Sequence, residues 1–260
     1  MSINPEVRAY WEQEPCGTDR AVVGDLPARS RQWFEEVERF RYEVEPFIHA
    51  VAQFTRHRGK RILEVGVGAG TDHLQWARAG CDCYGVDLTA AGIETTRARL
   101  ALDGLSSNLQ RVDAETLPFD DGFFDLVYSW GVIHHSAQPE RILGEIRRVL
   151  RPGGTFIGML YGRHSVTALH VWIRHALRAG RPWRSLSDVV WHHVESIGTK
   201  AYTEPEIHRL FADFGDVRTT PILTINDRAG CPRWVSQFFP SRWGWFIAVH
   251  ASKSERESLT

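Results

Sequence analysis

The sequence predicts an α/β protein built on a mostly parallel, doubly wound sheet. From residue 61 onward, apolar strand-like runs alternate with helix-like segments, a glycine-rich turn follows the first run, and acidic or polar residues end later runs. This alternation is typical of parallel sheets, whose strands are joined by crossover helices. Because ligands bind such sheets at the carboxyl ends of the strands, we expect one shared site there.

Residues 1–57 are expected to form a helical N-terminal cap. Between Trp33 and Phe40, apolar residues recur at helical spacing. Pro46 suits the first position of a second helix. The sheet domain is then expected to span residues 58–251.

Five strand-like runs form the parallel part of the predicted sheet. Gly80 suits the end of the first helix between them, Thr89 the N-cap of the second, and Pro139 the start of a later one. The chain thus returns to the sheet after a helix, as a doubly wound fold requires. The five runs are residues 61–65, 81–87, 108–112, 124–129 and 155–161.

Residues 162–202 are too long for an ordinary connection within a compact domain. They include an amphipathic pattern near residues 166–177. We therefore expect an inserted cap that folds over the substrate end of the sheet.

The remainder of the chain completes the sheet. Thr203 and Glu206 form a capping-box pattern at the start of a helix. Two last strands, near residues 217–224 and 245–251, are expected as an antiparallel edge, which brings the sheet to seven strands. The tail, residues 252–260, is expected to be disordered.

The turn after the first strand carries glycine at positions 66, 68 and 70. Glycine allows a backbone to approach a ligand closely, and beside a helix N-terminus this arrangement is typical of a nucleotide-type cofactor site. The dinucleotide fingerprint is G-x-G-x-x-G, but Thr71 stands where its third glycine would be. The turn alone therefore predicts a cofactor without specifying which one.

Four motifs in order resemble those of the class I S-adenosylmethionine (SAM)-dependent methyltransferases, in the small-molecule, UbiE-like branch. The resemblance implies a Rossmann-like fold, SAM as cofactor, and methyl transfer to carbon, oxygen or nitrogen of a small acceptor, giving S-adenosylhomocysteine. The motifs are residues 64–70, 85–89, the block 113–135, and 150–154.

The resemblance assigns the donor half of the site. The backbone of Gly66, Gly68 and Gly70 should approach the methionyl and ribose parts of SAM, and Glu64 should support that loop or the amino-acid end. Asp87 lies about twenty residues after the first glycine, where a carboxylate accepts from ribose hydroxyls.

The next block is assigned to the adenine and the sulfonium. Leu88 should pack on the adenine face, Asp113 should accept from its amine, and Ala114 and Glu115 lie beside that acid. A solvated strand end for Asp87 and a turn-forming role for Asp113 are the structural alternatives.

Ser129 and Trp130 follow the fourth strand, where a carbonyl or an aromatic face suits a cation, although Trp130 would equally serve as packing. From the cap, Tyr10, Trp11, Arg41 and Tyr42 are candidates to close over SAM, with surface or packing roles as the alternative. The chain contains ten tryptophans, and those that flank the sheet domain favour an apolar or partly aromatic acceptor.

Two histidines are the candidate catalytic residues. Methyl transfer needs alignment more than a nucleophile, and a base is required only when the acceptor must lose a proton. His134 and His135 are placed for that role, with a hydrogen-bonding role as the alternative.

A second histidine group lies in the insertion. On a helix His192 and Glu195 would share a face, but no third ligand can be named, so no metal is predicted. His193 belongs to the same stretch, and a polar contact to the acceptor, with Lys200 included, is the preferred interpretation.

The charge and composition of the chain limit the classes of partner and the cellular location that we expect. The net charge of −1 gives no overall drive toward nucleic acid or an anionic membrane. No apolar run is long enough to span a membrane, the N-terminus does not resemble a secretory signal, and the four cysteines form no C-x-x-C pair. We expect a cytoplasmic protein with no nucleic-acid or membrane partner.

Some alternatives stay open at this stage. Asp87 and the glycine turn also fit an NAD-type oxidoreductase, and a SAM-fold binding or regulatory protein without turnover would keep the same residues. The sequence leaves the acceptor unidentified and a homodimer as one option for the oligomeric state.

Overall fold

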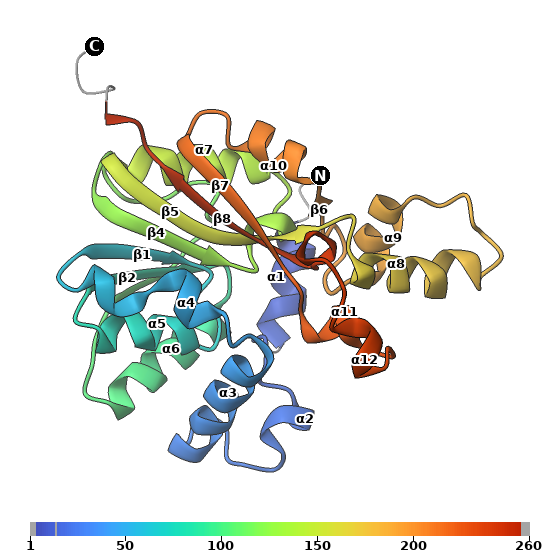
Figure 1. The fold of residues 1–260 in the computed structure, drawn as a ribbon. Helices are drawn as coiled ribbons and strands as arrows, with labels where there is room; N and C mark the ends of the chain where they lie inside the picture. Colours follow the sequence, from blue (N-terminus) through green and yellow to red (C-terminus); the bar gives the residue numbers. More distant parts are fainter. Residues whose placement is uncertain (1–3, 14, 256–260) are drawn as a thin grey trace.

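The computed structural model describes residues 4–13 and 15–255, and helices lead into the sheet (Figure 1). The N-terminal helix near Pro46 begins two residues later than expected, at Ile48, because the turn after Pro46 precedes it. These elements are α1 (Asn4–Gln13), α2 (Arg20–Val23), α3 (Arg31–Val44), α4 (Ile48–Ala52) and the 3-10 turn η1 (Phe54–His57).

The sheet confirms the predicted doubly wound α/β fold. Seven strands follow the order β3-β2-β1-β4-β5-β8-β7, and the two-residue β6 pairs with β5 at its end. Strands β1 to β5 run parallel, whereas β8 is antiparallel to both of its neighbours. The bounds are β1 Arg61–Val65, β2 Asp82–Asp87, β3 Asn108–Arg111, β4 Phe124–Trp130, β5 Leu150–Gly162, β6 Ala201–Tyr202, β7 Gly215–Ile222 and β8 Phe246–Ser252.

Helices cover both faces of the sheet and begin where the sequence places their caps. The Thr89 hydroxyl accepts from the Gly92 amide at the start of α6, and Thr203 and Glu206 form a full capping box on α10. Gly80 takes the left-handed conformation that ends a helix. The covering helices are α5 (Thr71–Arg78), α6 (Ala90–Leu102), α7 (Pro139–Val149) and α10 (Glu204–Leu210), with the 3-10 turn η2 (Ile133–His135) after β4.

Buried ion pairs join the N-terminal helices to the sheet unit. Arg41 of α3 donates to Asp72 of α5 at 2.8 Å, and Arg99 of α6 donates to Glu38 of α3 at 2.6 Å. The Asp72 and Arg99 side chains are almost fully buried. The cap is therefore bound to the sheet unit by charge pairs as well as by apolar packing.

The insertion departs from its predicted position. Instead of folding over the strand ends, its helices form a hairpin that projects from the body of the molecule, beside the short helices α11 and α12 (Figure 1). Only the returning segment after the hairpin reaches the site described below. The elements are α8 (Val166–Trp172), the π-helix η3 (Ile173–Leu177), α9 (Leu186–His193), α11 (Ile225–Arg228), α12 (Arg233–Ser236) and the 3-10 turn η4 (Ser241–Trp243).

The tail predicted to be disordered begins inside regular structure, because Ser252 is the last residue of β8. Residues 256–260 lie outside the described part of the chain.

Candidate functional site

The loop after β1 brings backbone to the carboxyl end of the sheet. Gly66, Gly68 and Gly70 have φ values of +83°, +50° and +74°, a conformation that favours glycine. A Cβ at Gly66 would lie 2.2 Å from Val132 and one at Gly70 would lie 2.8 Å from Thr96, whereas one at Gly68 would meet no described atom within 4 Å. Gly66 and Gly70 thus allow the loop to pack, and Gly68 leaves one side of it open.

Asp87, at the end of β2, is joined directly to this loop. Its Oδ2 accepts from the Gly68 amide at 2.9 Å, and its Oδ1 accepts from the amide and hydroxyl of Thr89 at 2.9 and 2.6 Å. A carboxylate offers about four lone-pair sites, so Asp87 keeps acceptor capacity. This position suits the ribose diol that the sequence assigns to it.

Asn4 of α1 is hydrogen-bonded to the segment that follows β3, which contains Asp113 and Glu115. Its Nδ2 donates to Asp113 Oδ2 at 2.9 Å and to Glu115 Oε1 at 2.7 Å, and its Oδ1 accepts from the Ala137 amide at 2.9 Å. Burial raises the pKa of Glu115, but hydrogen bonds from Ser136 and Asn4 bring it below its ordinary value. Glu115 is thus committed to contacts inside the protein, whereas Asp113 borders the cavity described below.

Arg41 and Tyr42 of α3 meet a buried acid at the start of α5. Arg41 donates to Asp72 Oδ2 at 2.8 Å and to Glu45 Oε1 at 2.6 Å. The hydroxyls of Tyr42 and Tyr128 donate to the same Asp72 carboxylate at 3.1 and 2.9 Å. One arginine therefore faces two carboxylates, and the wall that they form suits a cation.

Glu64 of β1 forms a hydrogen bond with His73 in the protein interior. The Ser107 hydroxyl donates to the Cys83 carbonyl at 2.7 Å, so it accepts from His73 Nε2 at 2.8 Å. His73 Nδ1, 3.0 Å from Glu64 Oε2, then needs a donor. Burial lowers the pKa of His73 to about 4 and raises the pKa of Glu64 well above its ordinary value, so the carboxyl carries the proton.

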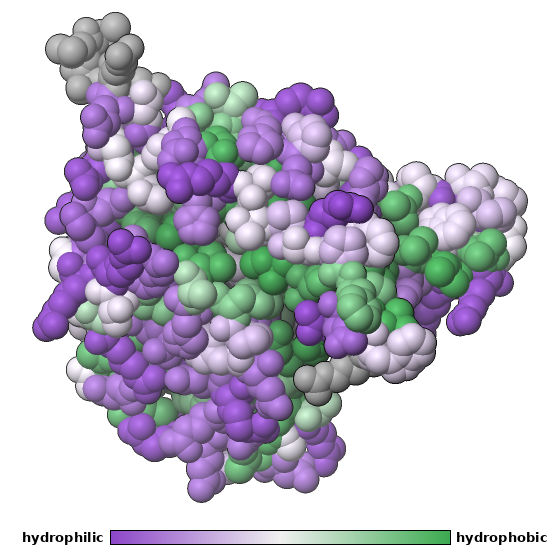
Figure 2. Space-filling view, in the orientation of Figure 1, coloured by the Kyte–Doolittle hydropathy of each residue, from purple (hydrophilic) through white to green (hydrophobic). Residues whose placement is uncertain are grey.

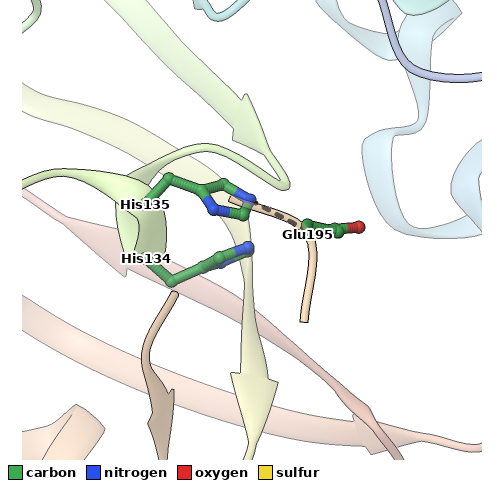
Figure 3. Close-up of side chains that lie close together, drawn as sticks. All are labelled: His134, His135 and Glu195. Carbon is green, nitrogen blue, oxygen red and sulfur yellow. Dashed lines mark ion pairs between the residues drawn. The ribbon is translucent and has the colours of Figure 1, made fainter. Parts of the chain in front are cut away.

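His134 and His135 lie at the opposite end of the site, and Glu195 comes to meet them from the segment after α9 (Figure 3). His135 Nε2 is 3.1 Å from Glu195 Oε2, and the Tyr161 hydroxyl lies 3.0 Å from each oxygen of that carboxylate. Burial and the Glu195 charge raise the pKa of Tyr161, which therefore keeps its proton and donates it.

Two hydroxyls lie against the Nδ1 atom of His135. They are Thr199 Oγ1, which donates to the Ser196 carbonyl at 2.7 Å, and Ser196 Oγ, and they lie 3.0 and 3.1 Å from Nδ1. The other ring nitrogen, Nε2, lies beside Glu195 and has no hydrogen-bond partner within the described residues. Burial and repulsion from His135 and Lys200 lower the pKa of His134 well below its ordinary value, so His134 is neutral.

A cavity of about 370 Å³ connects these groups. Trp130 lies on its wall and donates from Nε1 to Glu45 Oε2 at 2.7 Å. The residues singled out from the sequence that line the cavity are Glu64, Gly66, Gly68, Asp87, Leu88, Asp113, Ala114, Trp130, Trp11, Arg41 and His135.

Other residues singled out from the sequence lie outside this lining, for reasons visible in their contacts. The Ser129 side chain is fully buried and donates to the Val65 carbonyl at 3.2 Å instead of facing the cavity. Tyr10, in α1, is 45% exposed to solvent. The full set is Gly70, Glu115, Ser129, Tyr10, Tyr42 and His134.

The structure also corrects the interpretation of the second histidine group. The helix ends at His193, and Glu195 has a φ of +52°, so His192 and Glu195 do not share a helix face. His192 instead lies 3.2 Å from Asp188, and His193 stacks on His175. The Glu195 carboxylate lies with His134 and His135 instead, and these three residues offer ligand atoms within 4.8 Å of one another.

Lys200 has a structural role rather than the expected contact with an acceptor. Its Nζ donates to the carbonyls of Ser136 and Gly198 at 2.6 and 3.3 Å. It also lies 5.0 Å from the Trp191 ring. These contacts hold the returning segment against η2.

Comparison with known proteins identifies the family. A methyltransferase-domain family model matches residues 63–158. An uncharacterized protein of Mycobacterium tuberculosis is 31% identical over 208 residues, which cover 77% of this chain and 69% of that protein. The chain belongs to the class I SAM-dependent methyltransferases. It is therefore a SAM-dependent methyltransferase enzyme, and the NAD-type alternative falls away.

Further similarities are more partial or concern the fold alone. The phthiotriol/phenolphthiotriol dimycocerosates methyltransferase of M. tuberculosis is 43% identical over 100 residues, 38% of this chain and 36% of that protein. Geranyl diphosphate C-methyltransferase from Streptomyces coelicolor A3(2) has a TM-score of 0.62 at 16% identity and covers 97% and 98% of the two chains. The [4+2]-cyclase SpnF has a TM-score of 0.58 at 17% identity over 97% and 92%, so this fold also carries other chemistry.

Among the described residues, no helix of the methyltransferase is long and apolar enough to cross a membrane.

Proposed function

We propose that the methyltransferase binds SAM along the β1 loop and transfers its methyl group to a largely apolar small acceptor that gives up a proton to His135. The observation that carries the proposal is the free Nε2 of His135 at 3.1 Å from Glu195, inside an aromatic end of the cavity. The donor part and the acceptor part are supported by different residues.

The residues present fit SAM on structural grounds. The open side of Gly68 gives a ligand access to backbone, and Asp87 and Asp113 provide acceptors at two neighbouring strand ends. The carboxylates of Glu45 and Asp72 exceed the single charge of Arg41, which suits a sulfonium and an amine. When bound, SAM supplies an electrophilic methyl group.

Aromatic rings favour an apolar acceptor. Trp11 meets the His135 ring edge-on at 5.4 Å, and Trp245 stacks on Tyr161 at 4.2 Å. Phe246 also packs on Tyr161, at 5.7 Å. Such rings bury apolar surface and exclude water from the reacting groups.

His135 and Glu195 would act together on the acceptor. His135 Nε2 takes the proton as the acceptor bonds to the methyl group, and the Glu195 carboxylate, 3.1 Å from the same nitrogen, stabilises the charge of the resulting imidazolium. Tyr161 positions Glu195 through its hydrogen bonds. The left-handed backbone at Glu195, which costs of order 1 kcal/mol, turns this side chain inward.

Release of S-adenosylhomocysteine from a panel of acceptors tests the proposal. The panel should contrast apolar phenols and enols with multiply charged compounds. His135→Asn should lower kcat about 100-fold and leave the SAM affinity measured by calorimetry unchanged, and Glu195→Gln should cause a smaller loss. His192→Asn, on the outer surface, is the matched control.

Three results would contradict the assignment. Full activity of His135→Asn would remove the base. Loss of wild-type activity on chelation, with recovery on adding a divalent metal, would show that His134, His135 and Glu195 hold a metal instead. Turnover restricted to highly charged acceptors would refute the apolar acceptor.

A further inference from the structure

The surface formed by residues 166–193 and 225–238, which include α8, η3, α9, α11 and α12, is unlike the rest of the molecule. We call it the hairpin face. Six of its large apolar side chains are solvent-exposed, and three of them, Trp183, Trp234 and Phe238, are 78%, 71% and 78% exposed. Single exposed apolar residues are ordinary, but a contiguous group marks an interaction site. The other three are Leu169, Leu177 and Ile225.

These elements lie on the same side of the molecule, and α11 is bonded to α8. The Asp227 carboxylate of α11 accepts from the amide and hydroxyl of Thr167 in α8 at 3.0 and 2.7 Å. Figure 1 shows α8, α9, α11 and α12 together on one side, away from the sheet, and Figure 2 shows apolar surface on the projecting hairpin. The exposed side chains therefore lie where a flat partner can reach them.

The hairpin is also basic, although the chain as a whole has a net charge of −1. Residues 166–193 contain four arginines and one acidic residue, Asp188, a formal charge of +3. Arg184 pairs with Asp188. Arg174, Arg178 and Arg181 are exposed and have no ion pair within the described residues.

We propose that the hairpin face docks the methyltransferase onto an anionic lipid surface. Exposed tryptophan and leucine side chains beside unpaired arginines are the composition of surfaces that lie in a membrane interface. Two copies of the face would carry like charges against each other, which disfavours self-association. The expectation of no membrane partner rests on the net charge of the whole chain, which averages over this surface.

The face adjoins the acceptor end of the cavity. Asn226 of α11, between exposed Ile225 and buried Asp227, lines the cavity together with Trp245 and Glu195. A lipid-soluble acceptor would therefore leave the membrane close to the cavity. The docking proposal does not depend on the acceptor's identity or on His135.

Vesicle co-sedimentation of the full chain tests the docking. Phosphatidylcholine vesicles are compared with vesicles in which phosphatidylglycerol replaces half of the phosphatidylcholine. The wild type should bind the anionic vesicles at low salt and dissociate as salt is raised. An arginine near such a surface contributes about a fivefold change in partitioning, so the triple variant Arg174→Gln, Arg178→Gln and Arg181→Gln should bind about 100-fold more weakly.

Two further variants test whether vesicle binding depends on this face in particular. Trp183→Ala, at a highly exposed position, should weaken vesicle binding without lowering thermal stability. The control triple Arg56→Gln, Arg97→Gln and Arg209→Gln removes equal charge from distant helices and should bind like the wild type.

Three outcomes would overturn the proposal. They are no binding to anionic vesicles at low salt, an equal loss in both triple variants, and a dimeric mass by light scattering that Trp183→Ala returns to a monomer. The last result would assign the face to a second copy of the chain.

Discussion

Replacing Gly68 by alanine separates ligand contact from fold stability. The residue has a φ of +50°, and an added Cβ would meet no described atom within 4 Å. The stability cost is then only the left-handed strain of alanine, about 1–2 kcal/mol, or roughly 2–8 °C in Tm for a chain of this size. Because the methyl group would occupy the open side of the loop, SAM affinity should fall by about 1–3 kcal/mol, roughly 5- to 150-fold.

Gly104→Ala and Gly180→Ala are matched controls for this substitution. Both positions have positive φ, +66° and +69°, and open space where the new methyl group would lie, but neither lines the cavity. Thermal unfolding should give similar losses for all three variants, and calorimetry should show weakened SAM binding for Gly68→Ala alone. Equal SAM affinities in the three variants would refute the placement of SAM against Gly68.

Two further substitutions test buried polar groups. The raised pKa of Glu64 means that the folded chain holds a proton which the unfolded chain releases above its ordinary value of 4.5, so the wild type loses stability as pH rises. The free energy of unfolding of Glu64→Gln, relative to that of the wild type, should therefore rise by about 1.4 kcal/mol for each pH unit above 4.5, until the carboxyl ionises in the folded chain. Urea unfolding at several pH values measures this difference, and a difference that does not change with pH would contradict the prediction. Asn4→Ala leaves Asp113 and Glu115 without a shared donor and should cost about 1–3 kcal/mol of stability and weaken SAM binding. Unchanged calorimetry would show that α1 does not support the adenine end.

The sequence predicts the sheet and the donor half of the site because both depend on local patterns. Alternating apolar runs, caps such as Thr89 and the glycines of the β1 loop act over a few residues. Strand ends that are distant in sequence then meet automatically in a parallel sheet. This is why Asp87 and Asp113 could be placed from sequence alone.

The acceptor half depends on contacts that local patterns do not encode. Glu195 reaches His135 only because its backbone turns left-handed after α9, at a residue that is not glycine. The donor half also contains such a contact, because Asn4 acts across 109 residues to reach Asp113. One signal for the donor half was available in the sequence: Asp72, an acid in the first turn of a helix beside the glycine loop, where buried carboxylates need donors.

The insertion was misplaced for a related reason. An amphipathic pattern shows that a helix has an apolar face, but not which surface covers it. In the structure α8 packs against α9 and α11, and the hairpin of α8 and α9 points away from the sheet (Figure 1).

The ion pairs between the N-terminal helices and the sheet unit limit how the chain can be divided. Deleting residues up to 57 would remove Arg41 and Glu38, the partners of Asp72 and Arg99, and would expose apolar side chains such as Trp76, which packs on Phe54. Newly exposed apolar surface costs about 25 cal/mol per Å², and this loss adds to that of the ion pairs in a fold of marginal stability. Cap and sheet should therefore melt in one cooperative transition, and the sheet unit expressed alone should not fold.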